Sequence, residues 1–248
     1  MKTVSDRRIP LFLTDNFLRR LFFHPKKMLS KFISAGQVVA DIGSGPGFFT
    51  IAMAEIVGKE GRVYAADFDR KSIEALTRKA EKHNYSDIIE ARTTSAADLS
   101  FIPDASVDFA FSNGLLCCML DHEGAVREVE RILKPDGRAY LSVTKRLRKK
   151  DPRTVGKDEW HSLLQRFNVV SQGEGFMTRW AVVSARNIDR SDRASKKVVS
   201  KRRVKAWRRT SNSTSHVARR NRRRTSDALL PAEHYFLITC LQTDCLQR

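Results

Sequence analysis

The strongest constraint on this chain is a glycine-rich run, DIGSGPG at residues 41–47, set between two apolar segments. Residues 37–41 (QVVAD) are typical of a buried strand, and residues 48–57 (FFTIAMAEIV) are typical of a helix that stops at Gly58. Glycines in the connection let the backbone approach a ligand closely, and the following helix presents free N–H groups. The unit therefore predicts an α/β sheet that binds a nucleotide-type ligand at the carboxyl end of its first strand.

Strand and helix patterns alternate through the following residues, which implies βαβ units and a parallel sheet. The expected strands are residues 62–67, 87–92, 106–112 and 138–143, and the expected helices are residues 70–83, 123–133 and 157–167.

Two connections have recognisable turn chemistry. Residues 135–137 (PDG) indicate a turn before the strand at 138–143. The last two strands, residues 168–171 and 178–184, are joined by a glycine-bearing loop at residues 172–176. Because only a hairpin fits so short a link, we expect the last strand to run antiparallel.

The spacing of the glycines separates two classes of cofactor. Dinucleotide-binding loops space their glycines G-x-G-x-x-G, whereas Gly43, Gly45 and Gly47 follow G-x-G-x-G. Asp67 ends the second expected strand, 20 residues beyond Gly47. A carboxylate at that point can accept both hydroxyls of a ribose.

At these residues the chain resembles the class I S-adenosylmethionine-dependent methyltransferases, whose first motif is D-x-G-x-G-x-G. Residues 96–109 (AADLSFIPDASVDF) are similar to that family's adenine-side loop and fourth strand. Residues 128–137 (EVERILKPDG) are similar to its helix, turn and fifth strand. The resemblance covers residues 30–185 and is favoured over a nicotinamide enzyme. It implies a Rossmann-like methyltransferase fold, a three-layer α/β/α sandwich with a seven-stranded, mainly parallel sheet and one antiparallel strand.

The resemblance also implies S-adenosyl-L-methionine as the cofactor. The three glycines would line its methionine and adenosine parts, and Asp67, or Asp69 two residues on, would hold the ribose. The adenine loop departs from the family pattern, because the family often has an acid at the position of Ser95 and here the acid is Asp98. The complete set of expected cofactor-binding residues is Asp41, Gly43, Ser44, Gly45, Gly47, Asp67, Phe68, Ala96, Ala97, Asp98 and Asn113.

Methyl transfer is an in-line displacement in which alignment supplies much of the catalysis, so few residues are obligatory. The candidates for a general base are His122, Asp121 and His24. The competing and favoured interpretation is that Asp121 caps the helix beginning near Glu123, with His122 exposed in its first turn. His24 either faces the substrate or lies at the end of a helix.

The cysteines allow two interpretations. Cys117 and Cys118 form either a site for arsenic or another thiol-binding centre, or two small apolar side chains beside Leu115, Leu116 and Met119, which is the favoured interpretation. With Cys240 and Cys245 they give neither a metal-ligand spacing nor a disulfide framework, so no metal site is expected. Lacking an apolar leader or a membrane span, the protein is expected to be cytoplasmic.

Three regions are expected along the chain. Residues 1–34 hold aromatic and basic side chains at helical spacing and would pack on the sheet, lie on a membrane or, as favoured, form a helical lid. Residues 35–185 form the methyltransferase domain. Residues 186–248 form a basic, disordered tail, because residues 186–225 hold 16 Lys and Arg against 2 Asp in a chain whose net charge is +18.

The leading functional hypothesis is a methyltransferase acting on a small-molecule acceptor, of the kind that methylates quinones and similar compounds. One alternative is an RNA methyltransferase tethered through the tail, which could bind nucleic acid without sequence preference. The other is a non-catalytic cofactor- or nucleic-acid-binding protein. A tail not under selection as protein is a further hypothesis for residues 186–248. The acceptor, any catalytic base and the oligomeric state are not encoded in these motifs.

Overall fold

The computed structural model describes residues 5–8, 24–145 and 151–186. The tail beyond residue 186 and most of the expected N-terminal helical segment lie outside the described residues. In the part of the chain that is described, no helix is long and apolar enough to cross a membrane.

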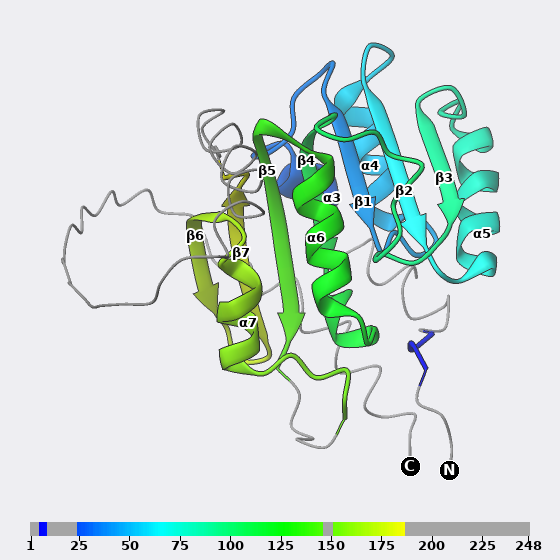
Figure 1. Ribbon diagram of the computed structural model, residues 1–248. Helices are drawn as coiled ribbons and strands as arrows, with labels where there is room; N and C mark the ends of the chain where they lie inside the picture. The colour runs from blue at the N-terminus through cyan, green and yellow to red at the C-terminus, as the bar shows by residue number, and fades with distance from the viewer. Residues whose placement is uncertain (1–4, 9–23, 146–150, 187–248) are drawn as a thin grey trace, which may run out of the picture. The chain divides into compact units, whose positions relative to one another are not determined.

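A seven-stranded sheet forms the centre of the domain, in the order β3-β2-β1-β4-β5-β7-β6 (Figure 1). Neighbouring strands pair in parallel from β3 to β5, whereas β7 is antiparallel to both β5 and β6. This arrangement confirms the mainly parallel sheet with one antiparallel strand. The strands are β1 (Val38–Ile42), β2 (Arg62–Asp67), β3 (Ile89–Thr93), β4 (Val107–Asn113), β5 (Leu133–Thr144), β6 (Asn168–Glu174) and β7 (Thr178–Ser184).

Helices cover both faces of the sheet, as expected for a three-layer sandwich (Figure 1). The described helices are α3 (Pro25–Leu29), α4 (Phe48–Val57), α5 (Arg70–Lys82), the 3₁₀ turn η1 (Leu116–Cys118), α6 (His122–Ile132) and α7 (Lys157–Leu164). Helices α3, α4 and α5 pack on one face, and α6 and α7 on the other.

Alternation along the strands supplies the two cores. In β2, Val63 and Ala65 belong to the cluster with α4 and α5, whereas Tyr64 and Ala66 belong to the cluster with α6 and α7. Successive strand residues point to opposite faces, and all four are buried. A strand covered on both faces reads as a continuous apolar run, which explains why its bounds were predicted correctly.

The expected turn at residues 135–137 is wrong, because these residues lie within β5. Leu133 pairs with Val107 and Arg138 pairs with Phe109, so the intervening residues of β5 bulge out opposite Asp108. Lys134 Nζ donates to Asp108 Oδ1 at 2.7 Å and holds the bulge closed. The turn-forming residues 135–137 therefore produce a β-bulge inside a long strand instead of a turn that separates two elements.

Strand β6 is also longer than expected, because it runs to Glu174 and shifts register between Val169 and Ser171. The hairpin connection to β7 is correspondingly shorter than the expected loop at residues 172–176.

Candidate active site

The glycine loop connects the carboxyl end of β1 to α4 and bends tightly. Gly43, Gly45 and Gly47 all have positive φ, at 81°, 52° and 86°. A Cβ at Gly43 would lie 2.9 Å from Leu115 Cδ1, and one at Gly47 would collide with Leu76. A Cβ at Gly45 would meet nothing within 4 Å. The outer two glycines are thus required by packing, while the middle one borders open space.

Asp41 and Ser44 shape this loop from beneath. Both are buried, and Thr50 Oγ1 donates to Asp41 Oδ2 at 2.6 Å, which ties β1 to α4. The Ser44 N–H donates to the carbonyl oxygen of Ala66 at 3.0 Å. Neither residue lines the pocket described below. Asp41 and Ser44 therefore hold the loop in shape but do not contact a ligand in the pocket.

Asp67 lies at the carboxyl end of β2, directly opposite the loop. Its Oδ2 accepts the Gly45 N–H at 2.8 Å, and its Oδ1 accepts the Asp69 N–H at 2.8 Å. Burial raises the pKa of Asp67, although the two backbone hydrogen bonds oppose that shift. Since each carboxylate oxygen has two acceptor sites, Asp67 keeps the capacity to bind hydroxyl groups of a ligand.

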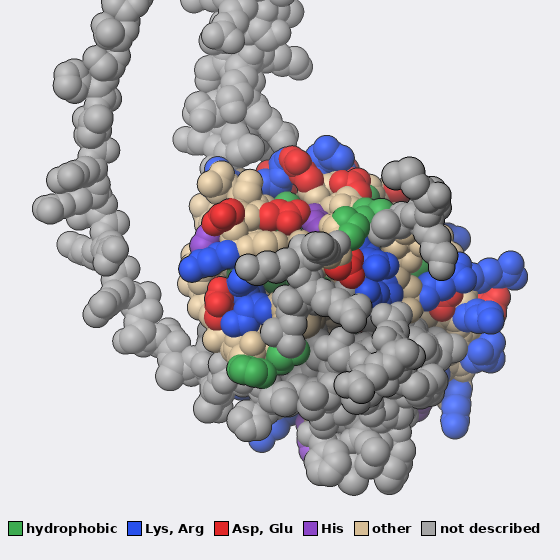
Figure 2. All heavy atoms as spheres, turned by 90° about the horizontal axis from the view of Figure 1, so that it is seen from below, with side chains coloured by type: hydrophobic (Ala, Val, Ile, Leu, Met, Phe, Trp, Pro, Cys, Tyr) green, Lys and Arg blue, Asp and Glu red, His purple; other side chains and the backbone are tan. Residues whose placement is uncertain are grey.

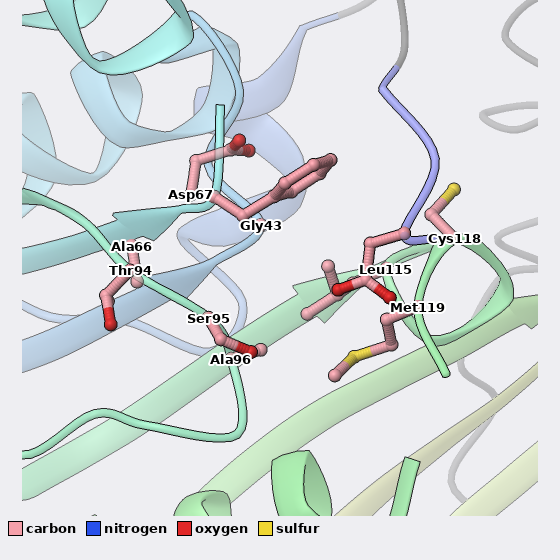
Figure 3. Close-up of a pocket in the computed structure, with 11 residues that line it drawn as sticks. Gly43, Ala66, Asp67, Thr94, Ser95, Ala96, Leu115, Cys118 and Met119 are labelled. Atoms are coloured by element: carbon pink, nitrogen blue, oxygen red, sulfur yellow. The ribbon is translucent and has the colours of Figure 1, made fainter. Parts of the chain in front are cut away.

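A pocket opens beside Asp67 at the carboxyl ends of β1 and β2 (Figure 3). Four of the expected cofactor-binding residues line it: Gly43, Asp67, Phe68 and Ala96. Its remaining lining residues are Asp6, Ala66, Thr94, Ser95, Leu115, Cys118 and Met119.

The loop after β3 contributes backbone and small side chains to this pocket, with Ser95 in the lining. The Ala97 N–H donates to Ser95 Oγ at 3.2 Å. Asp98 turns back on its own loop, where its Oδ1 accepts the Ser100 N–H at 3.3 Å. Asp98 therefore does not take the place of the acid that the family often has at the position of Ser95, because Ser95 lines the pocket and Asp98 does not.

Two residues of α6 anchor this loop. Glu128 Oε2 accepts the Leu99 N–H at 2.8 Å. Arg131 donates to the carbonyl oxygens of Leu99 at 2.8 Å and Ile102 at 2.9 Å. Arg131 also pairs with Glu128, and this ion pair lowers the pKa of Glu128. The clamp fixes the backbone just beyond the pocket wall.

Asn113 ends β4, and its side-chain oxygen accepts a hydrogen bond from Ser142 Oγ at 2.9 Å. The same hydroxyl oxygen accepts the Gly114 N–H at 3.0 Å. Asn113 thereby joins β4 to β5 at the edge where the pocket opens, without lining the pocket.

Residues 5–8, here called the N-terminal strap, lie across the turn at η1. Asp6 Oδ1 accepts the Leu120 N–H at 3.0 Å, and the Arg7 N–H donates to the carbonyl oxygen of Cys118 at 2.7 Å. The strap is held from its other side by an ion pair between Arg7 and Asp151 at 2.9 Å. Sequence reasoning missed Asp6, because nothing in MKTVSDRRIP marks it as part of a site.

The candidate general bases lie elsewhere. Asp121 accepts the Gly124 N–H at 2.8 Å, which confirms it as the cap of α6. The expected exposure of His122 is wrong, because its ring is buried between Glu159 Oε1 at 2.7 Å and the carbonyl oxygen of Met119 at 2.9 Å. Exposed His24 precedes α3 at its N-cap position. None of the three lines the pocket.

Among the described residues, no group of three or more His, Cys, Asp or Glu side chains is arranged to hold a metal ion.

Residues 40–141 match the family model described as a methyltransferase domain. The chain is 30% identical over 131 residues to a demethylmenaquinone methyltransferase of Lactobacillus johnsonii, covering 53% of this chain and 51% of that protein. It is 34% identical over 109 residues to a ubiquinone/menaquinone biosynthesis C-methyltransferase of Hahella chejuensis, covering 44% and 43%. The chain thus spans about half the length of the curated relatives it matches.

Among solved structures, a SAM-dependent methyltransferase from Aquifex aeolicus superposes with a TM-score of 0.60 at 24% identity, covering 70% of this chain and 95% of that one. This likeness, with the strand order described above, establishes the fold of the domain.

Proposed function

We propose that this chain, which carries a class I S-adenosylmethionine-dependent methyltransferase domain, transfers a methyl group to a small and largely apolar acceptor. The domain match and the two named relatives support the reaction class. The pocket supports the rest, because it combines part of the glycine loop and the half-buried carboxylate of Asp67 on one side with apolar side chains on the other. We take residues 35–185 as the catalytic domain and residues 1–34 as its lid.

The residues present fit the cofactor. Gly45 leaves open the space that a Cβ would fill, and Asp67 has acceptor capacity for a ribose. Phe68 and Ala96 offer apolar surface for an adenine. When bound, S-adenosyl-L-methionine supplies an electrophilic methyl group on a positively charged sulfur. The chain's own contribution is to hold that group in line with the acceptor and to exclude water.

The acceptor side of the pocket is formed by Leu115, Met119 and the N-terminal strap (Figure 3). Leu115 and Met119 favour an apolar molecule. Apart from Asp67, Asp6 is the one carboxylate among the described residues that line the pocket. We propose that Asp6 receives the proton that an acceptor releases when it is methylated. This assignment gives the strap a chemical role as well as a covering role.

A reduced quinone ring is the first acceptor to test, because both named relatives methylate in quinone biosynthesis according to their names. The charge pattern supports a small molecule over RNA. On the described part of the face at the carboxyl ends of the strands, acidic and basic side chains are interspersed (Figure 2).

The test is methyl transfer by the full chain from radiolabelled S-adenosyl-L-methionine. Demethylmenaquinol and total RNA serve as acceptors in separate reactions. The proposal expects label in the quinol fraction and none in RNA. Label in RNA alone would replace the proposed acceptor class, and transfer to neither would refute a quinol acceptor.

A further inference from the structure

The 3₁₀ turn η1 places two adjacent cysteine sulfurs side by side, and one of the two residues, Cys118, lines the pocket. Cys117 Sγ and Cys118 Sγ lie 4.0 Å apart. Both approach the carbonyl oxygen of Gly114, at 3.1 Å and 3.8 Å. A disulfide requires about 2.05 Å between the sulfurs, so this turn does not bring them to bonding distance. Their separation suits an atom bound between them.

The surroundings of Cys117 favour its thiolate form. The hydrogen bond with Cys118 lowers the pKa of Cys117 to about 6, against the opposing effect of burial. Hydrogen bonds with Thr144 and the positive charge of Arg7 act in the same direction. A thiolate is the nucleophilic form of cysteine, and a low pKa makes it available at neutral pH.

The pair also has a route to ligands. Cys117 and Cys118 are both buried, but Cys118 lines the pocket beside Leu115 and Met119. The hydrogen bond from the Arg7 N–H to the Cys118 carbonyl oxygen lays the N-terminal strap over the same turn (Figure 3). A ligand bound to both sulfurs would therefore lie at the part of the pocket wall that Cys118 forms, next to the strap.

We infer that Cys117 and Cys118 form a dithiol site for trivalent arsenicals, the class of soft ligand that bonds two thiolates at once. With an arsenic oxide R–As=O, the two S–H bonds and the As=O bond break, two As–S bonds form, and one water molecule leaves. No electron is transferred, because arsenic remains trivalent. The site does not depend on the identity of the methyl acceptor.

The experiment uses phenylarsine oxide and the full chain carrying Cys240→Ser and Cys245→Ser, so that Cys117 and Cys118 are the remaining cysteines. Intact-mass spectrometry should show one equivalent bound with loss of water. The adduct should survive excess 2-mercaptoethanol and be removed by 2,3-dimercaptopropanol, since only a dithiol competes with a chelating pair.

The matched variant carries Cys118→Ser in addition to these two substitutions. Circular dichroism reports whether it stays folded. It should leave at most an adduct that 2-mercaptoethanol removes. Absence of any adduct on the parent protein would overturn the proposal without reference to a variant. An adduct equally resistant to 2-mercaptoethanol in the Cys118→Ser protein would also overturn it, because a single thiol would then suffice.

Discussion

Gly45 provides a test of how the cofactor approaches the glycine loop. Its φ is 52°, and a Cβ built there meets no protein atom within 4 Å. Replacement by alanine therefore costs about 1–2 kcal/mol of folding free energy from the left-handed backbone alone. The methyl group also enters the space in which we place the ligand, so binding should weaken at least about tenfold, or 1.4 kcal/mol.

Gly36 is the matched control. Its φ is 77°, and a Cβ there also meets nothing within 4 Å, but it precedes β1 at the end of the strand away from the pocket. Gly36→Ala and Gly45→Ala should lose similar free energies of unfolding in urea. Only Gly45→Ala should lose affinity for S-adenosyl-L-methionine in a calorimetric titration. Equal affinities in the two variants would refute the placement of the cofactor against Gly45.

Three further predictions concern the carboxylates and the loop clamp. Asp67→Asn should weaken S-adenosyl-L-methionine binding at least about tenfold. Because burial raises the folded-state pKa of Asp67, its ionisation opposes folding above that pKa, and the opposition fades as pH falls toward the unfolded value. Asp67→Asn removes this penalty but keeps only one side-chain oxygen for the two backbone N–H donors, so its free energy of unfolding relative to the parent should rise between pH 3 and pH 7 in urea titrations. A relative free energy of unfolding that stays constant or falls over this range would contradict this. Asp6→Asn should leave the Kd of the cofactor unchanged and slow single-turnover methylation of demethylmenaquinol roughly a hundredfold. Asp6→Glu should restore part of that rate. An unchanged rate in Asp6→Asn would show that Asp6 takes no part in the chemistry. Arg131→Lys should cost about 1–3 kcal/mol and weaken cofactor binding, because one ammonium nitrogen replaces the two guanidinium nitrogens that each donate to a loop carbonyl. Arg166→Lys, whose partners are surface carboxylates, should cost less than about 1 kcal/mol. Equal losses in the two arginine variants would argue against the clamp.

The elements that sequence patterns predicted well are those whose signals are local. Helix α4 and strands β2 and β7 have the expected bounds, because largely apolar segments end at a glycine, a charged residue or a loop. The glycine loop was predicted because three closely spaced glycines follow a strand pattern and precede a helix pattern, and all three adopt positive φ. The cap at Asp121 was predicted because an N-cap bond involves residues only three positions apart.

Three of the failures depend on partners far away in the sequence. His122 is buried because Glu159 of α7 reaches its ring, and nothing around His122 signals that partner. Residues 135–137 lie in a strand because β4 pairs on both sides of them. Asp6 reaches the pocket because its strap is fastened to Leu120 and, through Arg7, to Asp151. Such long-range contacts leave no periodic trace in the residues that make them.

The central claim is tested most directly by calorimetric titration of the full chain with S-adenosyl-L-methionine, S-adenosylhomocysteine and NAD in parallel. The account predicts micromolar binding of the first two, worth about 8 kcal/mol, and no binding of NAD. Binding of NAD alone, or of none of the three, would contradict it.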